Sequence, residues 1–424
     1  MTASDSQKPV AAFIPWLFWG LAALFYCYGF FQRVAPSVMV DDLMRDFAVS
    51  AAVLGNLSAF YFYAYAGVQL PVGVLVDRFG ARRVLAVAAL ACGAGSALFG
   101  MASTIEVAYM GRLLIGLGAA FTWVGTLKIV SVWFPANQFA MISGMTLMLG
   151  MGGGIGGQAP LAAFVDMVGW REAMVFAAIV AAVLAAVILL VVRDGKGDHS
   201  EGPQPGQVGI LDGLKSAMSR RQTWFIGGFG FFMTAPMLSF GGLWGVPYMM
   251  SVHGLERPAA GLMASTMMIG WAIGAPLSGW LSDRIGRRKP LMMGGALVAV
   301  LTISAAIYLP GVSVLALRAL LLINGIAAGC MVIGFAAARE HNKPEAGGAS
   351  LGLVNMLVMA SGAVFQPLIG LLLDAKWDGV VVAGARVYGI DAYNWAFLTL
   401  SICGIGAFLA AFMVKETHCR QVVN

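Results

Sequence analysis

The chain has 424 residues, of which 60% are hydrophobic and 11% are charged, and its mean hydropathy is +0.84. Because an average soluble domain has about 25% charged residues, this composition excludes a soluble globular protein, and the hydrophobic content excludes a disordered one. The five cysteines and four histidines have no metal-ligand spacing, so we expect neither a metal site nor a cofactor.

Twelve apolar segments are long enough to cross a bilayer as helices, each of which needs about 20 residues. They are too long and too continuous for the strands of a membrane barrel, which is the other structure able to span lipid. The predicted spans are residues 13–38, 50–76, 84–103, 106–133, 140–165, 171–192, 223–251, 259–282, 290–309, 313–338, 348–374 and 391–413. The predicted fold class is therefore an all-α polytopic membrane protein.

A polar stretch containing Gly-Pro and Pro-Gly pairs separates the sixth span from the seventh. We therefore expect an N-terminal six-helix bundle in residues 1–193, a cytoplasmic linker in residues 194–222 and a C-terminal six-helix bundle in residues 223–424. Within the linker, residues 209–221 are predicted to form a short interfacial helix, because their apolar side chains fall on one side.

Lysines and arginines are distributed unevenly between the two sides of the membrane. The side that holds both termini carries 17 of them, and the opposite side carries five. Since cytoplasmic loops carry the excess of basic residues, we expect a protein of the inner (plasma) membrane with both termini in the cytoplasm. Basic loops that face anionic lipid also account for the net charge of +6, so we expect no nucleic-acid partner.

Three features recur in the two halves at a nearly constant offset. The sequence Gly73-Val-Leu-Val-Asp77-Arg78-Phe-Gly80-Ala-Arg82-Arg83 is echoed 206 residues later by Gly279-Trp-Leu-Ser-Asp283-Arg284-Ile-Gly286-Arg287-Arg288. Arg112 and Arg318 are also 206 residues apart, and Gln158 with Asp166 matches Gln366 with Asp374 at an offset of 208. Parallel six-helix repeats are the plan of one class of transporters.

The repeated loop resembles the signature loop of the major facilitator superfamily. The resemblance covers the whole chain, through the helix count, the linker, the loop charges and the repeat. It implies two pseudo-symmetric six-helix bundles and a gate that latches the halves together in one conformation and releases them in the other. The predicted gate residues are Gly73, Asp77, Arg78, Gly80, Arg82, Arg83, Asp283, Arg284, Gly286, Arg287 and Arg288.

Away from the ends of the predicted spans, four residues are charged, and all of them are basic: Arg33, Arg112, Lys128 and Arg318. A charge in the hydrocarbon region is energetically costly and by default marks a functional site. We expect Arg33, which shares a helix face with Tyr26 and Phe30, to bind a carboxylate or phosphate through paired hydrogen bonds. Lys128 is predicted to contact the substrate or the gate, and Arg112 and Arg318 are predicted to share a structural role.

The first half resembles one branch more closely. Gln32-Arg33-Val-Ala-Pro36, Arg112-x3-Gly116-x-Gly118 and Trp133-Phe-Pro135 are similar to motifs of the anion–cation symporters, which carry sugar acids and other organic anions. The resemblance implies that Arg33 binds the substrate carboxylate. The acids that carry the coupling proton in that branch are replaced here by Gln32 and Ala119, so we expect uptake to depend weakly on a proton gradient.

The counterpart of Arg33 in the second half, at the offset of 206, is Ser239. The organic phosphate antiporters have an arginine in that helix, so the sequence favours a monocarboxylate over a doubly charged phosphate. The predicted substrate-binding residues are Arg33, Gln32, Tyr26, Tyr61, Tyr65, Lys128, Gln158, Asn355 and Gln366.

Together these features predict a monomeric secondary transporter that moves a small organic anion across the bilayer by alternating access. Two alternatives are a carrier of drugs or zwitterions such as short peptides, and a membrane sensor that transports nothing. An enzyme is not expected, because the sequence offers no nucleophile–base pair or metal cluster.

The charge bias gives a testable topology. In a cysteine-free background, a cysteine placed at position 46 should react with a membrane-impermeant maleimide added outside the cells, whereas one at position 202 should not. The opposite labelling pattern would contradict the predicted orientation.

Overall fold

The computed structural model describes residues 13–195, 210–343 and 346–423 of the chain. These residues are almost entirely helical, which confirms the predicted fold class. The first half contains α1 (Ile14–Val34), η1 (Ala35–Val38), α2 (Val40–Phe47), α3 (Ala51–Phe79), α4 (Ala81–Gly100), α5 (Ile105–Trp133), η2 (Ala136–Gln138), α6 (Phe139–Gly156), α7 (Ala159–Val168) and α8 (Trp170–Val191).

The second half begins after a short helix that lies between the bundles in sequence, α9 (Ile210–Ser219). It contains α10 (Arg221–Pro236), η3 (Met237–Trp244), α11 (Gly245–His253), α12 (Arg257–Ile285), α13 (Lys289–Tyr308), α14 (Val314–Ala328), α15 (Met331–Glu340), α16 (Gly347–Ala375), β1 (Val381–Val382), β2 (Ala385–Arg386) and α17 (Ile390–Met413). The predicted short helix is confirmed as α9, while residues 196–209 of the predicted linker lie outside the described residues.

Within the described residues, eleven helices are long and apolar enough to cross a membrane. The remaining predicted span, the fifth, is helical but broken into α6 and α7. The break covers Gly157 and Gln158, and Pro160 lies in the first turn of α7, where its missing N–H is tolerated. The tenth predicted span has a short turn between α14 and α15, and the first ends in the 3₁₀ turn η1.

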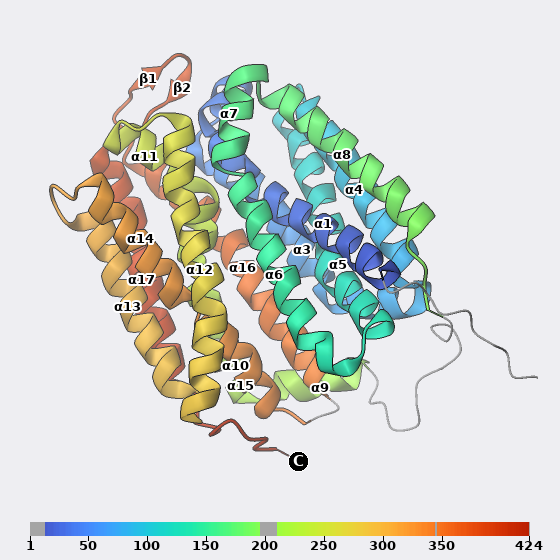
Figure 1. Ribbon diagram of the computed structural model, residues 1–424. Helices are drawn as coiled ribbons and strands as arrows, with labels where there is room; N and C mark the ends of the chain where they lie inside the picture. The colour runs from blue at the N-terminus through green and yellow to red at the C-terminus, as the bar shows by residue number, and fades with distance from the viewer. Residues whose placement is uncertain (1–12, 196–209, 344–345, 424) are drawn as a thin grey trace, which may run out of the picture.

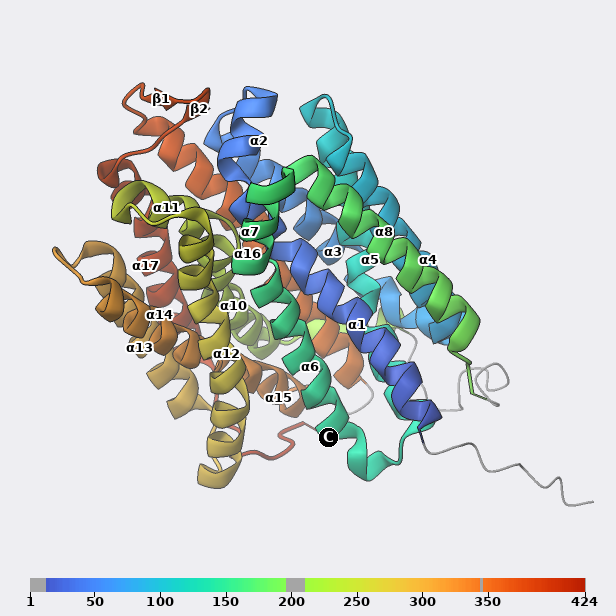
Figure 2. The ribbon, with the colours of Figure 1, turned by 45° about the horizontal axis from the view of Figure 1, so that its top comes forward.

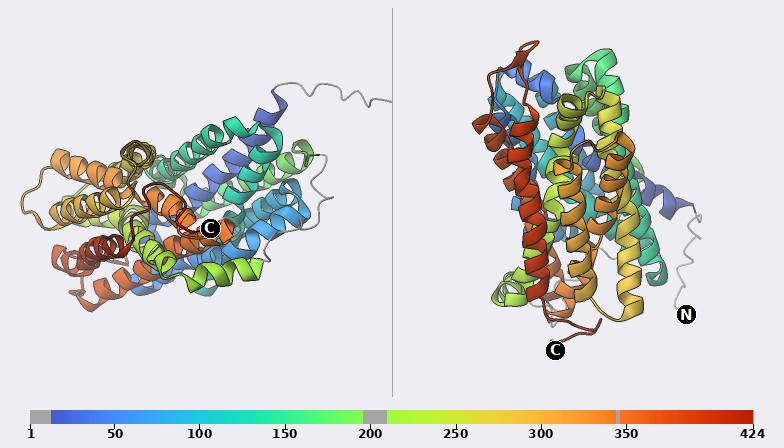
Figure 3. Two further views of the ribbon diagram at one scale, coloured as in Figure 1. Left: turned by 90° about the horizontal axis from the view of Figure 1, so that it is seen from below. Right: turned by 90° about the vertical axis from the view of Figure 1, so that its left-hand side faces the viewer.

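The spans form two bundles that lie side by side (Figure 1). Figure 2 shows α2 close to the β1–β2 pair at one end of the molecule, which we call the hairpin end. The opposite end carries α9 and the turns α3–α4 and α12–α13, and we call it the linker end. Seen from the linker end (Figure 3, left), α9 runs lengthwise along one edge of the molecule.

Helices α3 and α16 join the two halves along much of their length, and glycines allow their backbones to approach closely. A Cβ atom at Gly55 would lie 2.5 Å from the carbonyl oxygen of Gln366, and one at Gly370 would lie 2.3 Å from that of Ala51. Small residues at helix crossings are the usual basis of close packing in membranes, where no hydrophobic effect drives helices together.

Because the two backbones are so close at this crossing, adding a single methyl group there should lower the stability of the protein. Gly55→Ala should destabilise the protein by about 1–3 kcal/mol, the usual cost of overpacking, because the α16 backbone occupies the space. Gly67→Ala is the matched control on the same helix, since nothing lies within 4 Å of a Cβ there, and it should be neutral or slightly stabilising. Thermal unfolding in detergent measures both, and equal melting temperatures would contradict the prediction.

Candidate functional site

Arg33 lies in the last turn of α1, in the interior of the molecule. Its side chain is only 7% exposed, and its guanidinium carbon lies 4.1 Å from the centre of the Phe30 ring, one turn earlier on the same helix. The Nε atom has no hydrogen-bond partner among the described residues. A buried guanidinium group in this state has unused donor capacity, which an anion can satisfy.

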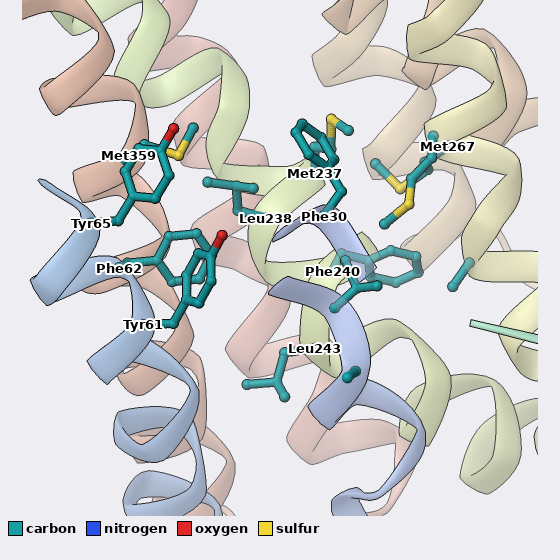
Figure 4. Packing of buried hydrophobic residues seen from close by; sticks show 14 of the residues in the cluster. Phe30, Tyr61, Phe62, Tyr65, Met237, Leu238, Phe240, Leu243, Met267 and Met359 are labelled. Atoms are coloured by element: carbon teal, nitrogen blue, oxygen red, sulfur yellow. The ribbon is translucent and has the colours of Figure 1, made fainter. Parts of the chain in front are cut away.

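Two tyrosines of α3 complete the aromatic wall around this arginine. The guanidinium carbon lies 5.8 Å from the ring centre of Tyr61 and 5.6 Å from that of Tyr65, both within the usual range of a cation–π contact. Tyr61 is fixed because its hydroxyl donates to the carbonyl oxygen of Gly29 at 3.2 Å. Figure 4 shows the wall gathered with Met237, Leu238 and Phe240 of η3, so the site lies where the two halves meet.

Two further predicted residues lie at this site. The Tyr26 ring packs against Phe30, with 5.0 Å between the ring centres, and against Trp123 at 5.3 Å. Asn355 of α16 interacts with the Tyr65 side chain from the second half. The structure therefore brings five of the nine predicted substrate-binding residues together, from α1, α3 and α16.

Gln32 occupies a different environment, although it precedes Arg33 directly. Its amide nitrogen donates to the hydroxyls of Tyr28 at 2.6 Å and Ser96 at 2.8 Å, and all three side chains are buried. Consecutive helix residues point in different directions, so Gln32 joins α1 to α4 rather than extending the aromatic wall.

Arg112 lies close to the site, whereas its repeat counterpart does not. It is fully buried, donates to the carbonyl oxygen of Gln32 at 2.8 Å, and has its guanidinium carbon 5.3 Å from the Tyr61 ring centre. That hydrogen bond holds the turn of α1 that carries Arg33. Arg318 is exposed on α14, so the two repeat-related arginines have different environments and the shared structural role is not seen.

The two repeat-related glutamines both hold η3, a π-helical segment of the second half. The amide nitrogen of Gln158 donates to the carbonyl oxygen of Gly241 at 2.7 Å, and that of Gln366 donates to Leu238 at 2.8 Å. Ser239 lies between these carbonyls in sequence, is fully buried, and its hydroxyl has no partner among the described residues. Because π-helical turns leave the regular hydrogen-bond ladder and often occur at functional sites, η3 is the second-half wall of the candidate site.

Lys128 lies with the predicted gate and not with the aromatic wall. Its ammonium group forms an ion pair with Asp77 at 3.0 Å. Gly80 has a φ of 79°, a conformation that favours glycine, and it allows the tight turn into α4. A carboxylate oxygen of Asp194, which follows α8, accepts a hydrogen bond from the Arg82 backbone N–H at 3.0 Å. Asp194 therefore caps the start of α4.

The second signature loop, between α12 and α13, has the same turn and the same kind of helix cap, and it contains more ion pairs. Arg288 forms ion pairs with Asp283 at 2.6 Å and with Glu340 at 2.7 Å. Glu416, which follows α17, accepts the backbone N–H of Arg288 at 2.9 Å, as Asp194 does in the first half. Gly286 has a φ of 69° at the equivalent turn.

Repeat-related aspartates connect the two halves at the hairpin end. Asp374 of α16 accepts the backbone N–H groups of Ala51 at 3.3 Å and Ala52 at 2.8 Å, so it caps α3 of the other half, whose own N-cap residue makes no side-chain cap. Its counterpart Asp166 pairs at 3.4 Å with Arg257, the first residue of α12. Ala51 and Arg257 are themselves 206 residues apart.

A second acid strengthens this connection. Arg257 also pairs with Asp42 of α2 at 2.7 Å. The contacts of Asp374 with α3 and of Arg257 with Asp42 and Asp166 are called the hairpin-end contacts below. The repeat of Asp166 and Asp374 is visible in the sequence, but their contacts with the other half are not. Their spacing relative to the starts of α3 and α12 is the signal that could have indicated these contacts.

Comparisons with known proteins agree with this architecture. The sequence profile of the Major Facilitator Superfamily matches residues 20–365 and 235–421. The chain is 23% identical over 280 residues to a probable sulfoacetate transporter of Cupriavidus necator, covering 63% of this chain and 65% of that protein. It is 24% identical to the membrane sensor protein UhpC of Salmonella typhimurium, covering 95% of this chain and 92% of that one.

A solved structure has the same fold. It is a bacterial homologue of the human lysosomal transporter Spinster in an inward-facing, unoccupied conformation, and it superposes with a TM-score of 0.75 at 17% identity. The match covers 96% of this chain and 98% of that one.

The hairpin-end contacts predict a conformational effect of removing one cap. Asp374→Ala should favour separation of the halves at this end, because loss of an N-cap costs about 0.5–2 kcal/mol. Spin labels at the exposed positions Met167 and Val380, one in each half, should report a larger population of long distances by double electron–electron resonance.

Asp378→Ala is the matched control, since Asp378 lies at the same end and the hydrogen bond that it accepts from the Val380 backbone N–H, at 3.4 Å, lies within its own loop. Its distance distribution should match that of the unmodified protein. An unchanged distribution in Asp374→Ala would rule out a latching role.

Proposed function

We propose a substrate class for this chain on the premise that it belongs to the Major Facilitator Superfamily. It is an integral membrane protein of a transporter family. The proposed substrate is a small organic anion that carries a carboxylate, and Arg33 is the residue proposed to bind it. The single observation that carries the proposal is the buried guanidinium group of Arg33, which has an unpartnered nitrogen and aromatic rings but no ion-pairing carboxylate around it within the described residues.

The aromatic rings around Arg33 offset only part of the cost of burying its charge. An arginine in a dry interior retains its charge, and leaving that charge unpaired is costly. Phe30, Tyr61 and Tyr65 offset part of the cost through their ring faces. A carboxylate offsets far more, because the planar guanidinium group binds it through two charge-assisted hydrogen bonds.

The second half supplies neutral groups for the rest of the substrate. Ser239 and Gln366 each have a buried oxygen without a hydrogen-bond partner among the described residues. Their position on η3 and α16 suits a substrate that spans from one half to the other. The proposed function is also in keeping with one relative, described as a probable transporter of sulfoacetate, which is an organic anion.

The orientation and the transport cycle belong to the same proposal. If the termini lie on the cytoplasmic side of the inner membrane, the hairpin end lies on the outer side. The hairpin-end contacts then close the outer side, and their rupture opens it.

The decisive experiment is transport by purified protein in liposomes, with Arg33→Ala as the test variant. Loss of a charge-assisted contact of about 1.5–3 kcal/mol should weaken substrate binding by roughly ten- to 150-fold. Arg33→Lys should recover little, because an ammonium group lacks the planar fork. Arg318→Ala, which removes an exposed intraspan arginine, is the matched control and should transport normally.

Three outcomes separate the alternatives. Full transport of organic anions by a folded Arg33→Ala protein would eliminate the anion site. Tight binding without any flux in the unmodified protein would support a sensor, which is how the relative UhpC is described. Collapse of uptake by a protonophore would contradict the expectation, based on Gln32 and Ala119, that coupling to protons is weak.

A further inference from the structure

A crevice of about 540 Å³ opens at the linker end, beside the turn that joins α12 to α13, and it shares no residue with the candidate substrate site. We call it the basic crevice, and it is lined by Arg287, Lys289, Pro290, Met293, Glu416 and His418. We propose that the basic crevice binds the phosphate of an anionic phospholipid headgroup. This inference does not depend on which substrate the protein carries.

The one acid that lines the crevice is already occupied. Its carboxylate accepts four backbone N–H groups, from Arg288 at 2.9 Å, Lys289 at 3.0 Å, Thr417 at 3.0 Å and His418 at 3.1 Å. Burial raises the pKa of Glu416, but these four donors outweigh that effect and leave the pKa below its ordinary value. Glu416 is therefore held ionised by backbone donors at the start of α13 and just after it, and the side-chain donors of Arg287 and Lys289 are not used on its carboxylate.

Those basic side chains keep donors available for a ligand. Arg287 is exposed and has no ion-pair partner in the described part of the chain, in contrast to its neighbour Arg288. Lys289 donates to the carbonyl oxygen of Phe412 and lies 4.9 Å from the centre of that ring. An ammonium group has three donors, so Lys289 can bind an anion and keep this contact.

The internal repeat shows that the fold does not require the extra base. Residue 81, which is 206 residues before Arg287, is an alanine. The first half nevertheless builds the same turn, with Asp194 capping the backbone N–H of Arg82 at 3.0 Å. The turn therefore folds without a base at this position, so the Arg287 side chain is not needed to build it.

The apolar surroundings favour a lipid over a free phosphate ion. Pro290 and Met293, which lie near the start of α13, are the apolar residues that line the crevice. Leu297 and Leu301 follow Met293 at four-residue intervals on the same helix face, and they are 48% and 60% exposed. A phospholipid fits this arrangement, with its phosphate at the two bases and an acyl chain along the stripe.

The test uses the purified full-length protein in detergent and short-chain lipids as probes. Dioctanoyl phosphatidylglycerol should bind more tightly than dioctanoyl phosphatidylcholine, measured by microscale thermophoresis. Arg287→Ala restores the residue that the first half has and should lower the affinity for phosphatidylglycerol about fivefold, since one basic residue near anionic lipid contributes about 1 kcal/mol. Arg287→Glu should lower it further.

Arg284→Ala is the matched control. Arg284 lies in the same turn and is exposed, but its guanidinium carbon lies 5.2 Å from the Trp280 ring centre and it does not line the crevice. Its variant should bind phosphatidylglycerol normally. Equal affinity for the two lipids, normal binding by Arg287→Ala, or an equal loss in Arg284→Ala would overturn the proposal, and full displacement by millimolar inorganic phosphate would assign the crevice to a free anion instead.

Discussion

The architecture of the first half depends on keeping guanidinium groups charged in an interior that contains little to neutralise them. Arg33 and Arg112 are both buried, and both contact the Tyr61 ring. Cation–π contacts and a backbone carbonyl of Gln32 hold them, while no carboxylate pairs with either in the described part of the chain. These contacts hold two buried guanidinium groups in place while leaving the Nε atom of Arg33 without a hydrogen-bond partner among the described residues.

The two halves share the acids that contact or cap helix starts, but they differ in the charged side chains at other repeat-related positions. Asp166 and Asp374 contact the starts of α12 and α3 across the two halves, and Asp194 and Glu416 cap α4 and α13 within them. On these shared frames the charged groups diverge. Arg33 corresponds to Ser239, Ala81 to Arg287, and buried Arg112 to exposed Arg318. The first half therefore supplies the charge of the candidate site, while the second half supplies neutral groups there and extra charge at the linker end.

Much of the fold was predictable because lipid restricts the chain to long apolar helices. The predicted spans, the short helix α9 and the repeat follow from hydropathy, the linker composition and the offset of 206 residues. The break between α6 and α7, the small helix α2 and the β1–β2 pair were not predicted, because short elements carry weak periodicity. Within the candidate site, helix geometry predicts which residues of one helix share a face: Tyr26 with Arg33 on α1, and Tyr61 with Tyr65 on α3. Asn355 joins them from α16 of the second half.

The sequence by itself determined which side chains had to be explained, since an intraspan charge or a repeated motif is visible without coordinates. It could not determine where side chains from separate helices point. Lys128 pairs with the gate acid Asp77, Gln32 joins α4, and the glutamines Gln158 and Gln366 hold η3. These outcomes depend on the rotation of each helix about its axis and on which glycines allow close contact. Both are settled by packing between helices far apart in the chain, and only the tertiary structure contains that information.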